Sequence, residues 1–461
     1  MRRFAWQWLV ISSFLWAELS AVAETRPQYG GTLRVAIHLT LTSLDPADSM
    51  APDSIARRNI TSLIFETLTT TDDTGRVRPG LATAWQESAV GQPKTQRWEF
   101  HLRRGVKFHD GTALSPEIVA SSLRIANPSW NVSAGADSVT IERDAAEVDL
   151  LAELALARNA IVKRNPEGTL SGTGPFYMTE WQAGRKVSLA AEENYWRGRP
   201  FLDAIEIEMG KNFRDQLLAL SVGRADLVDV TPEQSHRGSP EGRAVSSSAP
   251  VELVALLFSR GPQSSEDELL RQALALSIGR AAIRSVLLQG AGEAAGSILP
   301  NWMSGYGFVF PTEPDLVRAR HQREQVRKVS AWSLGYDASD SIARLLAERI
   351  ALNARDAGLT LQPTTAASSD LRVVRIPLAS TDPWVSLANL ADICGLPEPK
   401  SNGHSAEDPY VAERAMLGTQ RLIPLFHLPV SYAGATTLKN WAPRLDGGWD
   451  LADAWLGSEQ P

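Results

Sequence analysis

The chain has 461 residues, which is more than a single hydrophobic core usually holds, so two or three domains are expected. Hydrophobic residues make up 43% of the chain and charged residues 21%, as in ordinary soluble globular proteins. The net charge of -7, without any run of Lys and Arg, excludes a nucleic-acid-binding protein, because such proteins carry a basic surface.

The N-terminus has the pattern of an export signal. Arg2 and Arg3 precede an apolar run from Trp8 to Ala17, and Ala21-Val22-Ala23 matches a small-residue cleavage site. The alternative, a membrane anchor, needs about 20 apolar residues, roughly twice the length of this run. We therefore expect a signal peptide over residues 1–23, cleaved near Ala23.

The next segment predicts a first strand and a first helix. Residues 29–36 predict a turn and a short buried strand. Asp45-Pro46 breaks this pattern, because the residue before a proline avoids the helical conformation. Apolar residues recur at a helical period over residues 55–68, which predicts a helix there.

A half-buried strand and a turn follow. Trp98, Phe100 and Leu102 alternate with polar residues, which is typical of a strand with one buried face. Asp110-Gly111 predicts a tight turn. Ser115 is a favourable N-cap residue for a helix that we expect to run to about residue 123.

The stretch from Ser171 to Pro200 predicts a β-hairpin. Gly172, Gly174 and Pro175 are typical of a tight turn, because glycine accepts positive φ and proline fixes φ. The two strands are expected over residues 176–180 and 186–190. Aromatic side chains that supply an apolar surface beside the hairpin are Trp181, Tyr195 and Trp196.

The rest of the chain alternates strand and helix patterns, which indicates an α/β architecture. A continuous apolar run over residues 251–258 predicts a buried strand. Residues 342–357 give the clearest helix pattern, which ends at Gly358. Further strands are expected over 203–208, 330–336, 359–361 and 373–378, further helices over 213–220, 268–276 and 280–288, and a loop over 394–408.

Residues for catalysis or metal binding are sparse. Cys394 is the only cysteine, which excludes an intramolecular disulfide and a cysteine-based metal cluster, and we expect it to be a packed side chain. His101, His109 and Asp110 are the best metal candidate, but Gly105 interrupts the strand that would align them. The motifs of serine hydrolases, P-loop proteins and zinc proteases are absent from the sequence. We expect no catalytic set, no metal and no cofactor.

Six motifs resemble one family in their identity and order. They are GGTLRV, SLDPA, RPGLATAW, FHLRRGVKFHDGTALSPE, GTGPFYMTEW and NYWRGRPFLDAIEI. In this order they are similar to the family 5 extracellular solute-binding proteins of bacterial ABC importers, which are dipeptide, oligopeptide and nickel receptors. The resemblance runs from Gly30 to about Pro300 and returns near the end, at residues 423–427 and 448–451.

The resemblance implies a two-lobed α/β fold of the type II periplasmic-binding-protein kind, with a subdomain inserted in the first lobe. On this map, residues 24–50, 168–250 and 421–461 form lobe I. Residues 51–167 form the inserted subdomain, and residues 251–420 form lobe II. The strand over residues 251–258 is expected to cross between the lobes.

The resemblance also implies a function. We expect a monomeric receptor in the periplasm that captures a small solute, a peptide by default, between two closing lobes and delivers it to ABC permease subunits in the inner membrane. Two alternatives are an exported hydrolase that uses the cleft between the lobes, and a ligand sensor without transport. The hydrolase hypothesis would make His109 and Asp110 the residues to test.

Ligand contacts are expected where the lobes meet. Met50 and Ala51 lie where the chain should leave lobe I, although a plain linker is the alternative. Arg375 lies on a predicted strand that runs toward the edge of the cleft in lobe II.

The second candidate segment is Ser380-Thr381-Asp382-Pro383-Trp384. Peptide-binding members of the family carry an aspartate just before such a segment, and it anchors the ammonium group of the ligand. Thr381 falls at the natural register, and Asp382 matches only after a shift of one position. Asp382 would otherwise cap the next helix, and Trp384 either stacks on the ligand or fills the core of lobe II.

Overall fold

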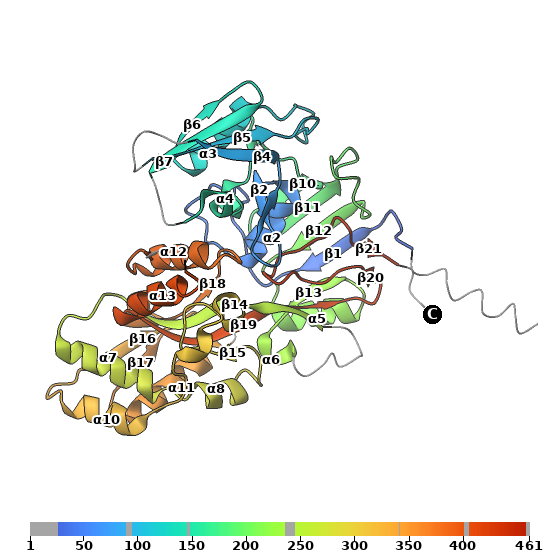
Figure 1. The fold of residues 1–461 in the computed structure, drawn as a ribbon. Coiled ribbons are helices and arrows are strands. Elements are labelled where there is room, and N and C mark those ends of the chain that lie inside the picture. Colours follow the sequence, from blue (N-terminus) through green and yellow to red (C-terminus); the bar gives the residue numbers. More distant parts are fainter. Residues whose placement is uncertain are drawn as a thin grey trace, which may run out of the picture.

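The protein has two lobes and a smaller unit beside one of them (Figure 1). The structure is a computed structural model that describes residues 26–88, 95–144, 148–235, 245–340, 342–400 and 405–457. The predicted export signal lies outside the described residues. Within the described ranges, no helix combines the length and the apolar character needed to cross a membrane.

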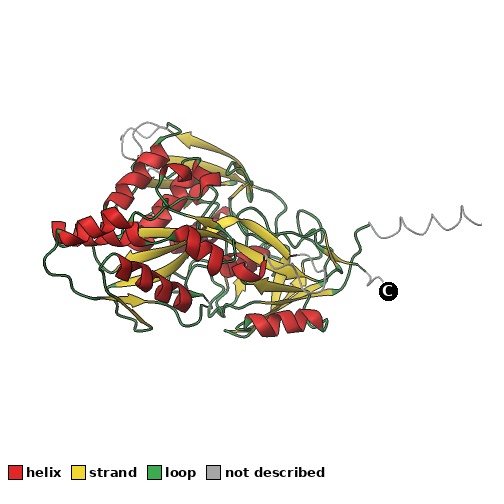
Figure 2. Ribbon diagram, turned by 90° about the horizontal axis from the view of Figure 1, so that it is seen from below, coloured by secondary structure: helices red, strands yellow, loops and turns green. Residues whose placement is uncertain are grey.

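One eleven-stranded sheet runs through both lobes, in the order β10-β11-β12-β1-β13-β19-β14-β18-β16-β17, with β15 paired to β19. Figure 2 shows its strands in the interior with helices around them. Lobe I denotes the end of the sheet from β10 to β13 with the helices packed on it. Lobe II denotes the end with β18, β16 and β17 and its helices.

Two long strands connect the lobes, β14 (Val245–Phe258) and β19 (Leu422–Gly434). Residues 251–258 were predicted to be the crossing strand, which is confirmed, and the strand begins six residues earlier. Pro250 faces Pro429 across the pair, and the register shifts on either side of Pro250. Because proline has no N–H to donate, the ladder is interrupted there.

Lobe I has a parallel centre, with β1 between β12 and β13, and an antiparallel edge formed by the predicted hairpin. Its strands are β1 (Thr32–Ala36), β10 (Phe176–Gln182), β11 (Lys186–Ala191), β12 (Ala204–Glu208) and β13 (Leu227–Val230). Its other elements are α2 (Ile55–Ile64), α5 (Phe213–Ser221), α6 (Pro232–Ser235), β20 (Leu438–Lys439) and β21 (Trp455–Leu456). The hairpin is confirmed, and its core includes Phe176 and Leu189 together with Ile60 and Leu63 of α2.

The smaller unit has its own antiparallel sheet, in the order β4-β5-β7-β6, and its own core. Its elements are β2 (Thr69–Thr71), β3 (Val77–Pro79), β4 (Ala82–Ser88), β5 (Thr95–Leu102), α3 (Pro116–Ala126), β6 (Asn131–Ala134), β7 (Ser138–Asp144), α4 (Leu150–Glu153), η2 (Ala157–Asn159), β8 (Lys163–Arg164) and β9 (Leu170–Ser171). This core runs from Leu68 to Ile161, within the range predicted for an inserted subdomain. The exact boundaries stay a prediction.

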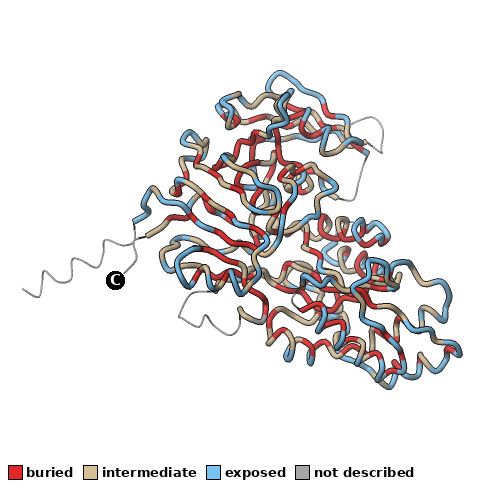
Figure 3. The backbone as a smooth tube through the Cα atoms, turned by 180° about the vertical axis from the view of Figure 1, so that it is seen from behind, coloured by how far each residue is buried: buried red, intermediate tan, exposed pale blue. Residues whose placement is uncertain are grey.

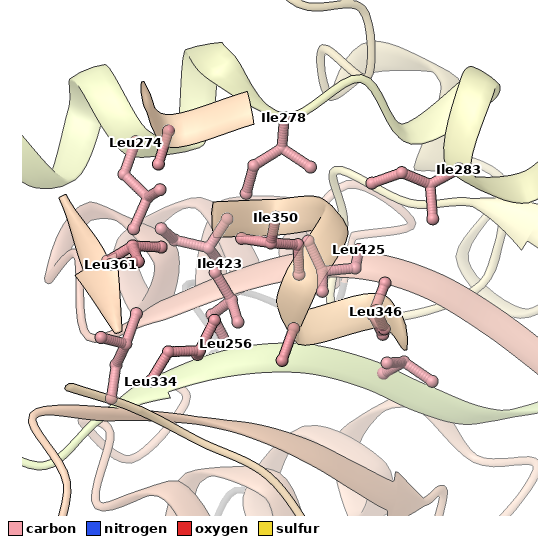
Figure 4. Packing of buried hydrophobic residues seen from close by; sticks show 14 of the residues in the cluster. Leu256, Leu274, Ile278, Ile283, Leu334, Leu346, Ile350, Leu361, Ile423 and Leu425 are labelled. Atoms are coloured by element: carbon pink, nitrogen blue, oxygen red, sulfur yellow. The ribbon is translucent and has the colours of Figure 1, made fainter. Parts of the chain in front are cut away.

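Lobe II is rich in helices, and its largest core lies between them and the sheet (Figure 4). Its elements are α7 (Ser265–Ser277), α8 (Arg280–Val286), β15 (Glu293–Ala294), α9 (Asn301–Ser304), η3 (Gly307–Val309), α10 (Leu316–Glu324), β16 (Trp332–Gly335), α11 (Ala343–Asp356), β17 (Leu361–Thr364), β18 (Leu371–Pro377), α12 (Pro383–Cys394) and α13 (Asp408–Gly418). Leu346 and Ile350 of α11 point into this core. Figure 3 shows that buried stretches run through the interior of the molecule and that exposed residues lie mostly at its periphery.

Cys394 lies in a second core cluster of lobe II and is almost completely buried. Burial raises the pKa of its thiol to about 11, so the reactive thiolate form is rare at neutral pH. The prediction of a packed side chain is confirmed.

A buried carboxylic acid in lobe II should make stability depend on pH. Glu413 of α13 is fully buried, and its Oε1 accepts hydrogen bonds from the backbone N–H groups of Ile298 and Leu299, the latter at 2.9 Å. Its Oε2 has no hydrogen-bond partner among the described residues. Burial raises the pKa of Glu413 to about 7, from an ordinary value of 4.5.

Because the folded-state pKa is raised, the folded protein holds the proton more tightly than the unfolded chain. The stabilisation is therefore complete at pH values below the pKa of Glu413 in the unfolded chain, and it is lost as pH rises through about 7. We expect the free energy of unfolding to fall by about 3 kcal/mol from this group between pH 4.5 and pH 7.5. Urea titrations across this range should show that Glu413→Gln removes this part of the decline, and an unchanged pH profile in the variant would contradict the assignment.

Candidate ligand-binding site

A cavity of about 600 Å³ lies where lobe I, lobe II and the smaller unit meet. Lobe I contributes helix α2 and residues 444–453, and the smaller unit contributes β2 and residues 155–160. Lobe II contributes Val251, Trp302, Met303 and residues 378–381. Cavities of this size, enclosed by several elements, are typical of small-molecule sites.

The lobe II wall after β18 is held in place by its own hydrogen bonds. Ser386 Oγ donates to the Ser380 carbonyl oxygen at 2.7 Å and accepts from the Ser380 N–H at 3.2 Å. Thr381 is only 7% exposed, and its hydroxyl oxygen has no hydrogen-bond partner among the described residues. The turn between β2 and β3 covers it, since a Cβ atom added at Gly75 would lie 3.2 Å from the Thr381 carbonyl oxygen.

Contacts across the cavity join the lobes. Arg58 of α2 pairs with Asp53 and also donates from Nη1 to the Leu378 carbonyl oxygen of lobe II at 2.5 Å. An apolar cluster joins the smaller unit to the start of α12 through side chains that include Leu156 and Val385. In Figure 1, α4 and α12 lie next to one another at this contact. The lobes are therefore in contact around the cavity.

A largely buried carboxylate, with a side chain that is 12% exposed, organises the lobe I wall. Glu66, just after α2, accepts hydrogen bonds at 2.8 Å from the hydroxyl groups of Tyr195 and Thr173 and from the indole N–H of Trp196. Burial raises the pKa of Glu66, although these three donors act in the opposite direction. The guanidinium of Arg197 lies 4.5 Å from the centre of the Trp196 ring. Both oxygens of Glu66 accept hydrogen bonds from neighbouring side chains, so the carboxylate ties Tyr195, Trp196 and Thr173 together behind the cavity wall.

The C-terminal part of the wall carries further charges. Arg444 donates from Nη2 to the Thr71 carbonyl oxygen at 2.9 Å, and its Nε lies 3.5 Å from Asp446 Oδ1. Burial and the neighbouring Asp453 raise the pKa of Asp450. Both signs of charge are thus present on the lobe I side.

The structure brings one of the predicted ligand-contact residues, Thr381, to the cavity. Met50 is 88% exposed and Ala51 is half-buried, and neither lines the cavity. Arg375 pairs with Glu252 of β14, with 2.7 Å between Arg375 Nε and Glu252 Oε2. Ligand contact by these residues stays a prediction.

The two remaining predicted residues belong to α12. Asp382 caps this helix, since its Oδ1 accepts from the Val385 N–H at 2.9 Å, which confirms the alternative reading of this residue. Trp384 packs against the same core cluster that holds Cys394, and neither side chain lines the cavity.

His109 and Asp110, two of the three residues considered as metal ligands, have other partners. His109 Nε2 lies 2.9 Å from the Gly174 carbonyl oxygen, and Asp110 forms an ion pair with Lys163. Neither His109 nor Asp110 lines the cavity. The described residues contain no group of three or more His, Cys, Asp or Glu side chains placed to hold a metal ion.

Several cavity residues escaped the sequence analysis, among them Arg58, Trp302 and Arg444. They come from segments that are far apart in the chain, and Arg58 and its partner Leu378 are 320 residues apart. Two local features of the sequence could have pointed to these cavity residues, namely a polar face on α2 and an isolated tryptophan after Pro300.

A family model for bacterial extracellular solute-binding proteins, family 5 (middle), matches residues 76–372. Nickel-binding protein NikA of Staphylococcus aureus is 26% identical over 217 residues, which cover 44% of this chain and 42% of NikA. Oligopeptide-binding protein AppA of Bacillus subtilis is 22% identical over 66% of this chain and 60% of AppA. Dipeptide-binding protein of Escherichia coli is 24% identical over 50% of this chain and 51% of its own length. The chain thus spans about half the length of these curated relatives.

Solved structures match over nearly the whole chain. DppA of Helicobacter pylori, in complex with the peptide STSA, has a TM-score of 0.77 at 18% identity and covers 94% of this chain and 99% of its own. AgaA of A. tumefaciens R10, in complex with agropinic acid, has a TM-score of 0.76 at 18% identity, and the match covers 93% of this chain and 99% of AgaA. These matches confirm the predicted two-lobed α/β fold of a periplasmic binding protein. Because the family model matches more than half of the chain, the protein belongs to the family 5 bacterial extracellular solute-binding proteins.

Proposed function

We propose that the protein is the exported substrate-binding component of an ABC importer and captures a small solute between its two lobes. The single observation that carries the proposal is the cavity, which is lined from both lobes next to two long connecting strands. The names of the relatives supply the class of solute, and peptide is the default.

The mechanism follows from the geometry. A solute that touches lobe I and lobe II at once makes all its contacts only in the closed form, so it shifts the population toward that form. The contact from Arg58 to Leu378 and the apolar cluster at α12 would be made as the lobes close. Permease subunits in the inner membrane would recognise the closed form and receive the solute from the periplasm.

A non-enzymatic role is part of this proposal. The hydrolase hypothesis depends on His109 and Asp110, which lie away from the cavity and are held by Gly174 and Lys163. No observation therefore favours hydrolysis. A sensor would bind the solute in the same way, and measuring solute uptake in cells that lack the gene would distinguish it from an importer component.

Thermal unfolding with a panel of solutes tests the proposal. Dipeptides, opines, sugars and nickel complexes are added at millimolar concentration to the chain without residues 1–23. We expect a solute of one class to raise the melting temperature without being converted, because only the folded state binds it. At a concentration 100 times Kd, the stabilisation should be about 2.7 kcal/mol. If no solute shifts the transition, or if the solute is turned over, the proposal is wrong.

A further inference from the structure

We propose that lobe II provides an apolar subsite, formed by Val251, Trp302, Met303 and Leu378, for an aliphatic or aromatic group of a charged small solute. The ligand class is an apolar amino acid or a short peptide with an apolar side chain. The inference rests on the proposed function, since it assigns one half of the same cavity.

The four residues are neighbours in the wall; Val251 and Leu378 are almost fully buried, so Trp302 and Met303 provide most of its exposed part. The Leu378 N–H donates to the Val251 carbonyl oxygen at 2.8 Å, and the indole N–H of Trp302 donates to the Pro250 carbonyl oxygen at 2.9 Å. Met303 packs against the core cluster that contains Leu378. Because the polar atom of the Trp302 ring is already used, what the ring offers to a ligand is an apolar face.

Charge is distributed unequally between the two sides of the cavity. None of the described lobe II residues that line it is charged, and the two with polar side chains are Ser380 and Thr381. The charged residues of the lining come from lobe I and are Arg58, Glu66, Arg197, Arg199, Arg444, Asp446, Asp450 and Asp453. Arg58 reaches the lobe II wall at the Leu378 carbonyl oxygen, so a carboxylate could be paired there, but an ammonium group that faced lobe II would lose its water without gaining a counter-charge.

This asymmetry orients the solute. An ammonium or a carboxylate group finds a counter-charge on the lobe I side, where Asp446 and Arg444 lie near each other. The uncharged part of the solute then faces Trp302 and Leu378. A molecule with charged groups at one end and an apolar group at the other matches both sides, and apolar amino acids and short peptides have this form.

Calorimetric titration of the chain without residues 1–23 tests the subsite. The probes are L-alanyl-L-leucine and L-alanyl-L-asparagine, which have similar shapes and differ in the polarity of one side chain. We expect the leucine peptide to bind at least about tenfold more tightly, the equivalent of burying one apolar side chain.

Two variants locate the preference. Trp302→Ala and Met303→Ser should each weaken binding of the leucine peptide and leave binding of the asparagine peptide nearly unchanged. Phe308→Ala is the matched control, because Phe308 is an aromatic residue close in the chain, 79% exposed and outside the lining. The control should retain the full preference. Thermal unfolding of each variant verifies that it is folded, and two different substitutions keep the test valid if one variant does not fold.

The outcomes separate this inference from the proposed function. Equal affinities for the two peptides, or a preference that survives both substitutions, would overturn the apolar subsite. If neither peptide binds but another solute of the panel does, the inferred ligand class is wrong and the receptor function stands. If no solute of the panel binds, both fail.

Discussion

Gly172→Ala is expected to prevent stable folding of lobe I. A Cβ atom at position 172 would lie 1.9 Å from the Ile64 carbonyl oxygen and 2.8 Å from the ring of Phe65. Real Cβ atoms do not approach other atoms so closely, and the Ile64 oxygen belongs to the backbone at the end of α2, so the helix or the segment would have to move. We expect a loss of about 3 kcal/mol or more in the free energy of unfolding.

Two hydrogen bonds prevent a simple adjustment at this site. The Gly174 N–H donates to the Ile64 carbonyl oxygen at 2.9 Å, and the Gly172 carbonyl oxygen accepts from the His109 N–H at 2.9 Å. Gly261→Ala is the control, since no atom lies within 4 Å of the added Cβ there. Urea unfolding should show a large loss for the first variant and almost none for the second. Similar midpoints for the two variants would disprove the close contact.

Glu66→Ala has the second largest expected effect. The substitution leaves the hydroxyl groups of Tyr195 and Thr173 and the indole N–H of Trp196 without their shared acceptor. A buried donor left without its acceptor costs about 1 to 3 kcal/mol, and three donors lose their acceptor here, so we expect a total loss of about 3 kcal/mol or more. The loss should appear in urea unfolding of the protein without ligand, so it is independent of any role of the cavity.

Two further variants calibrate this result. Tyr195→Phe removes a single hydrogen bond to Glu66 and should cost about 1 kcal/mol. Glu348→Ala removes an exposed carboxylate that pairs with Arg344 one turn away on α11, and should cost less than about 0.5 kcal/mol. A Glu66→Ala variant as stable as Glu348→Ala would mean that the network contributes little to folding.

Local patterns predicted much of the fold. Turn residues predicted the hairpin of lobe I, alternation predicted the strand β5, and a continuous apolar run predicted the strand β14. The helical period over residues 342–357 predicted α11, which spans Ala343–Asp356. These elements depend on the periodicity of neighbouring residues, which the sequence displays directly. The arrangement of two lobes came from the order of the family motifs.

The role of the glycines in the central stretch was explained incorrectly by the sequence analysis. Gly172 and Gly174 were attributed to a turn with positive φ, but neither has a positive φ in the structure. They are needed because the chain passes directly under the last turn of α2, whose carbonyl oxygens leave no room for a side chain. The three aromatic residues that were predicted to form one apolar surface have different roles. Trp181 packs on the lobe I core, whereas Tyr195 and Trp196 donate hydrogen bonds to Glu66. Close approach between distant segments has no local signature.

The ligand site was predicted less well for the same reason. Asp382 could be recognised as a helix cap from its position before Pro383, which is a local feature. The apolar surface around Trp302 is assembled from β14, α9 and the segment after β18. More than 120 residues of sequence separate Val251 in the first of these segments from Leu378 in the last. Only the folded chain shows that these segments meet, and that the charged lining comes from the opposite lobe.

The most direct test of the account is a crystal structure of the chain without residues 1–23 with a solute that raises its melting temperature. We predict that the solute lies in the cavity, touches α2 or residues 444–453 on one side and Trp302 or Leu378 on the other, and is chemically unchanged. A solute bound to one lobe alone, or outside this cavity, would contradict capture between the lobes.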